Sequence, residues 1–241
     1  MSNTKSPSFT IIEAYKLMGY FAEQALEKQS DNASAYFQEQ LRTYMRGILT
    51  NIDPSLTKIA ESWVISQTME SELGSLQQMV NVAENTKIKQ LVNQVLLQCI
   101  DIVKLNNINA RIVLIIGDGN NQTLTQAMQN AIGVSFGSKI SLIFFWPEHQ
   151  WKNSLSFAVA HEYSHLCQNS YVEKQFIDGK MINGKTGKPD TLLDAVLNEG
   201  ISDAFAMSLQ PSFTPNWIHP LTIQEENLAW ETMSELLDSE D

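Results

Sequence analysis

The residues best suited to chemistry form a short motif in the second half of the chain. His161 and His165 are four residues apart, and Glu162 directly follows the first histidine. Residues i and i+4 share one face of a helix, so two imidazole nitrogens can meet one zinc ion at about 2.0–2.1 Å. Such an ion would acidify a water molecule in an open coordination position, and Glu162 would take its proton. The motif therefore predicts a zinc-dependent hydrolytic centre.

Two histidines need a further ligand, and the next expected helix offers two carboxylates. Glu199 and Asp203 are again i and i+4, so both side chains leave one helix face. One can bind the metal while the other accepts the spare N–H of a ligand histidine, and Asn198 is a further polar candidate beside them. Gly200 costs about 1 kcal/mol within a helix, and we expect a close approach of the two helices to explain it.

Composition and charge narrow the classes of partner. The chain has 241 residues, enough for one large domain or two small ones, with 16 basic and 27 acidic residues and a net charge of −11. This charge argues against nucleic acid. No apolar run approaches the length of a membrane span and residues 1–9 resemble no secretory signal, so we expect no membrane partner and a cytoplasmic location. The oligomeric state is not indicated.

The first part of the chain, residues 1–106, is expected to form a helical subdomain. Apolar residues recur at helical spacing in residues 11–28, 33–49 and 56–103. No motif for chemistry occurs there. The only cysteines, Cys99 and Cys167, cannot build a disulfide framework, and we expect two buried thiols.

The second part, residues 107–241, is expected to be the catalytic region. A β-branched run at 112–116 predicts a strand, and apolar runs on both sides of Gly137 and Ser138 predict a hairpin with a two-residue type II′ turn. Further helices are expected from residue 154 past His165, over 191–210 and over 221–237. The expected fold class is α+β, mostly helical, with a small antiparallel sheet packed on the active-site helix.

The two motifs together resemble the gluzincin metallopeptidases, the clan of thermolysin. The resemblance implies a zincin-like fold and a peptide or protein substrate. It also implies that His161, His165 and Glu199 bind zinc, that Glu162 is the general base, and that Asp203 supports the first histidine.

Within this clan the chain is most similar to the YjaZ-type predicted zinc-dependent proteases. The features are the strand pair before residues 160–163, the Leu192-Leu193 pair leading to the second motif, and a later segment with Trp217 and Trp230. The resemblance covers about residues 130–235.

Other catalytic groups of the clan have no matching motif here. Thermolysin-like enzymes place a tyrosine, a histidine and an arginine around the tetrahedral intermediate, whereas no arginine follows Arg111. Tyr171 and His219 are candidates for the first two. Residues 139–146 take the place of the clan's substrate-aligning strand without its Asn-Ala signature.

Two functions are compatible with these residues. One is a zinc-dependent peptidase, and the other is a non-catalytic, zinc-stabilised binding or regulatory protein derived from one. The intact Glu162 favours the enzyme, because a structural zinc site has no use for a base beside an open position. The missing arginine favours the alternative.

Overall fold

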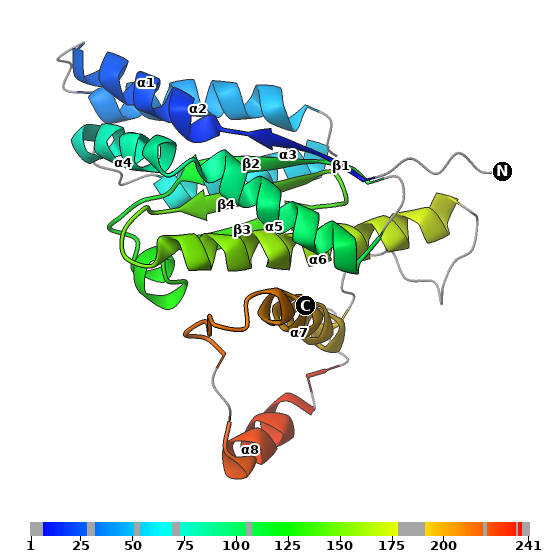
Figure 1. The fold of residues 1–241 in the computed structure, drawn as a ribbon. Coiled ribbons are helices and arrows are strands. Elements are labelled where there is room, and N and C mark those ends of the chain that lie inside the picture. The colour runs from blue at the N-terminus through cyan, green and yellow to red at the C-terminus, as the bar shows by residue number, and fades with distance from the viewer. Residues whose placement is uncertain are drawn as a thin grey trace.

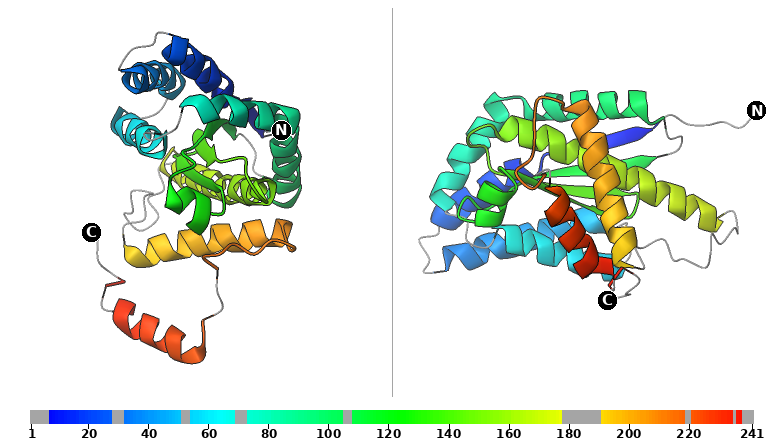
Figure 2. Two further views of the ribbon diagram at one scale, coloured as in Figure 1. Left: turned by 90° about the vertical axis from the view of Figure 1, so that its left-hand side faces the viewer. Right: turned by 90° about the horizontal axis from the view of Figure 1, so that it is seen from below.

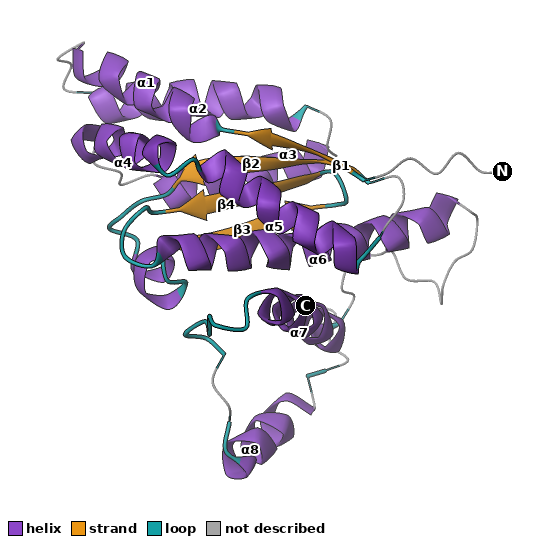
Figure 3. Cartoon of the chain, viewed as in Figure 1, coloured by secondary structure: helices purple, strands orange, loops and turns teal. Residues whose placement is uncertain are grey.

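The computed structural model describes residues 7–27, 32–50, 54–68, 73–104, 108–177, 191–218, 221–234 and 236–237. Within these residues the chain forms a four-stranded sheet surrounded by helices (Figures 1 and 3). The expected α+β class with a mostly helical chain is therefore confirmed.

The sheet has the strand order β1-β2-β4-β3 and is mixed. Its strands are β1 (Ser8–Ile12), β2 (Asn109–Ile116), β3 (Ala131–Phe136) and β4 (Ile140–Phe145). β1 and β4 both pair with β2 in parallel, and only β3 and β4 are antiparallel. The expectation of an antiparallel sheet was therefore wrong for two of the three strand pairs.

The predicted hairpin is present, with a longer loop than expected. Phe136 pairs with Ile140, which leaves the three residues 137–139 between the strands. Gly137 adopts a φ of +60°, a left-handed conformation that glycine reaches without steric cost. A single π-helical turn, Thr123–Ala127, precedes β3.

The helices of the first part connect β1 to β2. They are α1 (Ala14–Glu27), α2 (Ala33–Leu49), α3 (Pro54–Thr68), α4 (Leu73–Asn85) and α5 (Ile88–Ile102). The helix expected over residues 11–28 was wrong at its start, because residues up to Ile12 extend β1 beside β2. α1 and α4 contact β2, whereas α5 contacts α6 (Trp151–Ile177).

The second part supplies three more helices, α6 (Trp151–Ile177), α7 (Leu192–Leu209) and α8 (Ile223–Ser234). α6 lies along β3 and β4, and α7 packs on α6. α8 has no buried residue and stands apart from the sheet in Figure 1 and in the left-hand view of Figure 2. No helix in the described ranges is both long and apolar enough to cross a membrane.

One core joins the sheet to its helices. β2 and β4 are almost wholly buried, as their runs of branched and aromatic residues predict. Phe144, Phe145 and Trp146 belong to this core, and Cys99 and Cys167 are buried free thiols, as expected. Residues from α1 to α5 share the same core.

Candidate metal centre

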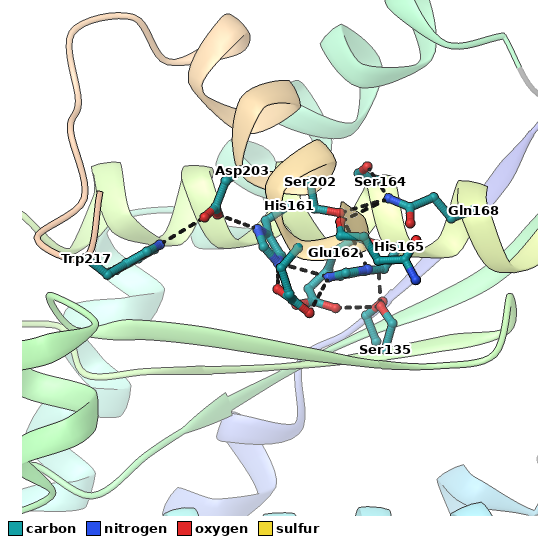
Figure 4. Close-up of polar contacts among 12 residues, drawn as sticks. Ser135, His161, Glu162, Ser164, His165, Gln168, Ser202, Asp203 and Trp217 are labelled. Atoms are coloured by element: carbon teal, nitrogen blue, oxygen red, sulfur yellow. Dashed lines mark hydrogen bonds and ion pairs between the residues drawn. The ribbon is translucent and has the colours of Figure 1, made fainter. Parts of the chain in front are cut away.

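The two motif histidines project from the middle of α6 toward α7. Their rings lie 4.7 Å apart, centroid to centroid, and the Nε2 atoms are 3.0 Å apart. Two ligand atoms in a tetrahedral zinc site are separated by about 3.3 Å. The helical spacing thus places both Nε2 atoms close enough to contact one ion. Figure 4 shows the two rings side by side.

A carboxylate from α7 meets this pair. Thr191 caps the start of α7 by accepting a hydrogen bond from the backbone N–H of Asp194 at 3.2 Å. Two turns further along, Glu199 Oε2 lies 3.2 Å from His161 Nε2, and Glu199 Oε1 lies 3.4 Å from His165 Nε2. The ligand atoms of the three residues all lie within 4.8 Å of one another. Two imidazoles and one carboxylate are the donor set of many catalytic zinc sites.

The other ring nitrogen of His161, Nδ1, also has a hydrogen-bond partner. His161 Nδ1 lies 2.9 Å from Asp203 Oδ1, and the indole N–H of Trp217 donates to Asp203 Oδ2 at 3.3 Å. With Nε2 directed at the cluster, Nδ1 carries the hydrogen that Asp203 accepts.

The second histidine is held in the same way by neutral groups. His165 Nδ1 lies 3.4 Å from Ser202 Oγ, and Gln168 Nε2 donates to that oxygen at 3.0 Å. The side chain of Gln168 thus ties α6 to α7 beside the two histidines. Both rings are therefore oriented from outside the cluster.

Glu162 is buried between α6 and β3, next to the cluster but outside the ligand set. Ser135 Oγ donates to Glu162 Oε2 at 2.6 Å (Figure 4). A Cβ added at Gly133 would lie only 2.3 Å from Glu162 Cγ, so this position must be glycine for α6 and β3 to approach this closely. Burial raises the pKa of Glu162, although the nearby His161 and His165 and the Ser135 hydrogen bond oppose it.

The electrostatics of the cluster favour a positive charge at its centre. Burial lowers the pKa of His161, yet hydrogen bonds to Asp203 and Glu199 outweigh burial and raise this pKa to about 10 in the metal-free chain. Hydrogen bonds from His161 and His165 hold the pKa of Glu199 well below its usual range. The carboxylate is therefore ionised, as metal binding requires.

Two cavities meet at the cluster, and both are bordered by Gly133, His161, Glu162 and Glu199. The first, about 370 Å³, extends along β3 to the C-terminal half of α6. The second, about 300 Å³, has an apolar lining toward the N-terminal half of α6. Residues specific to the second cavity include Met128, Ile132, Phe157 and Trp217. A chain laid along β3 would pass the ligand cluster between the two cavities.

The other residues expected at the site are placed differently. Asn198 lines the first cavity, and its carbonyl accepts from Gln168 Nε2 at 3.5 Å. Tyr171 is 56% exposed on α6 and borders neither of the two cavities. His219 lies outside the described residues.

Two structural expectations near the site were wrong. The strand with a free edge at the site is β3, because β4 is paired on both sides, with β2 and β3. The expected close helix contact at Gly200 is also missing, since an added Cβ would meet no described residue within 4 Å. Gly200 is exposed on α7, and among the described residues no contact requires glycine there.

Sequence reasoning missed several residues that hold the site. Gly133 and Ser135 are two positions apart on β3, so they lie on the same face of the strand. Two small residues on one face of a strand just before the motif are a signal that the strand packs closely on the helix. Ser202, three residues after Glu199, also shares the ligand face of α7. Gln168 and the role of Trp217 left no comparable signal, because their partners lie on other elements.

A family model described as "Predicted Zn-dependent protease (DUF2268)" matches residues 88–241 of the chain. The match includes His161, Glu162, His165 and Glu199 and the strands β2 to β4. No curated protein matches the chain. No solved structure matches it either.

Proposed function

The chain belongs to the family of predicted Zn-dependent proteases, and we propose that it is a zinc peptidase whose centre is the cluster on α6 and α7. The observation that carries this proposal is the convergence of His161, His165 and Glu199 beside a buried glutamate. A purely structural zinc site is usually closed by a fourth cysteine or histidine. The ligand group found among the described residues contains only these three.

The donor chemistry of the cluster fits zinc. Two imidazole nitrogens and an ionised carboxylate would hold the ion, and Asp203 and Ser202 would keep both rings turned toward it. When bound, zinc supplies a Lewis acid that lowers the pKa of water and polarises a carbonyl group.

Glu162 is the proposed general base. Its carboxylate borders both cavities, so it faces the space in which a peptide and an attacking water would meet. Burial raises its pKa, which suits a group that takes a proton from water and returns it to the leaving amine near neutral pH. Ser135 keeps one carboxylate oxygen occupied, which leaves the other for the water.

The order and spacing of these residues support the finer assignment to the gluzincins. The third ligand is a glutamate on the helix after the motif, and an aspartate one turn later contacts the first histidine. The mixed sheet with a free edge strand beside the motif helix supports a zincin-like fold. The net charge of −11 supports a peptide or protein substrate over nucleic acid.

The decisive experiment compares two glutamate-to-glutamine variants of the full chain. Glu162→Gln keeps the size of the side chain and should bind zinc normally, but it should lose about 10²–10⁴-fold in turnover because the base is gone. Glu148→Gln makes the same change at an exposed residue just before α6 and should behave as wild type.

The assay measures zinc content by elemental analysis and cleavage of a broad peptide library. We expect about one zinc per chain in the wild type and in both variants. A fully zinc-loaded wild type that cleaves no peptide would refute the peptidase and leave the non-catalytic zinc protein. Cleavage that survives Glu162→Gln would refute the role of the base.

A further inference from the structure

Trp217 lies at the metal centre although it comes from the segment that follows α7. Its indole N–H donates to Asp203, which in turn accepts from the ligand His161. We propose that Trp217 is a positioning residue that fixes the carboxylate of Asp203 and, through it, the ring of His161. This inference rests on the proposed zinc site.

The two oxygens of Asp203 have different partners. Oδ1 lies 2.9 Å from His161 Nδ1, and Oδ2 lies 3.3 Å from Trp217 Nε1. A carboxylate that accepts one hydrogen bond can still rotate about its Cβ–Cγ bond. Hydrogen bonds to both of its oxygens fix the plane of the carboxylate. Figure 4 shows the three side chains in this order, with Asp203 between the indole and the imidazole.

The indole is itself held by aromatic packing. Trp217 packs edge-on against Phe157, with ring centroids 5.7 Å apart and planes at 79°. Phe157 lies one helical turn before His161, and its ring also contacts that imidazole and the ring of Phe213. Trp217 therefore touches the His161 environment twice, through Asp203 and through Phe157.

The backbone around Trp217 is anchored to the segment before β3. The N–H of Asn216 donates to Gln129 Oε1 at 2.8 Å, and Asn216 Nδ2 donates to the carbonyl of Gln126 at 3.2 Å. These bonds place the indole at the wall of the apolar cavity. The backbone beside Trp217 is thus anchored from outside the α6–α7 pair, while Phe157 on α6 packs against its ring.

The test is a double-variant cycle on zinc affinity, measured with the purified full chain against a chromophoric chelator. Trp217→Phe removes the N–H donor and keeps a ring against Phe157. Because Trp217 is 38% exposed, we expect this variant to fold. We expect it to weaken zinc binding several-fold, less than the about 10–100-fold typical when a direct partner of a ligand histidine is lost. In the Asp203→Ala background, Trp217→Phe should have no further effect.

Trp230→Phe is the matched control, because Trp230 is 60% exposed on α8, away from the site. It should bind zinc as wild type does. Unchanged affinity of Trp217→Phe, or an equal loss in both backgrounds, would overturn the inference, since a general structural effect does not depend on Asp203. A wild type without zinc affinity would instead refute the proposed metal site itself.

Discussion

Replacing Gly133 by alanine places a methyl group against the proposed catalytic base. The added Cβ would lie 2.3 Å from Glu162 Cγ and 2.6 Å from Glu162 Oε1, whereas ordinary contact begins at 3.4 Å. Either Glu162 or β3 must therefore move by about 1 Å, well beyond what neighbours absorb in a close-packed interior. Glu162 is only 3% exposed and cannot turn outward.

The expected cost appears in both stability and turnover. Overpacking of a tight interior costs about 1–3 kcal/mol in the free energy of unfolding. A displacement of about 1 Å at a catalytic group can lower the rate about 10²-fold. Zinc content should stay near wild type, because the methyl group meets Glu162 before any of the three ligands.

Urea unfolding of the metal-free chain, elemental analysis and peptide cleavage measure these three effects. Gly200→Ala is the matched control, since a Cβ there meets nothing within 4 Å in the middle of α7. It should raise the free energy of unfolding by up to about 1 kcal/mol and leave cleavage unchanged. A Gly133→Ala protein with wild-type stability and turnover would refute the close packing of β3 on Glu162.

Three further outcomes are expected. Chelation should lower the melting temperature of the wild type, because an ion that binds only the folded chain stabilises it; an unchanged melting temperature would argue against a bound metal. Asp203→Asn should fold normally and bind zinc about 10–100-fold more weakly, measured by chelator competition. In the metal-free chain the pKa of His161 is raised from 6.5 to about 10, so protonated His161 stabilises the fold fully below about pH 6.5 and this contribution is lost as pH rises through 10. Urea unfolding between pH 6 and 10 should show this decline, and a His161→Asn variant with the same slope would contradict it.

The centre of the site follows from local spacing. His161 and His165, and likewise Glu199 and Asp203, share helix faces because of the 3.6-residue period, which a sequence shows directly. The groups that orient them are harder to predict, because Trp217 reaches Asp203 through a loop whose path depends on Asn216 and distant partners.

In the fold, too, local features were predictable from the sequence and pairings between distant segments were not. The β3–β4 hairpin was predictable because its strands are adjacent in sequence and share a glycine-containing loop. The parallel pairs of β2 were not, since their partners lie far along the chain and buried runs carry no sign of strand direction. β1 in particular merges with the apolar pattern of α1, so only its partner reveals it as a strand.

The position of β1 has a consequence for biosynthesis. Ser8 and Asn109 are hydrogen-bonded neighbours in the sheet, yet they are 101 positions apart in the sequence. At a synthesis rate of about 5–20 residues per second, β1 leaves the ribosome about 5–20 seconds before its partner strand. A chain begun at residue 88, where the family match starts, would lack β1 and expose an edge of β2. Such an edge of apolar residues is prone to pair with other chains, so we expect that fragment to aggregate when the full chain does not.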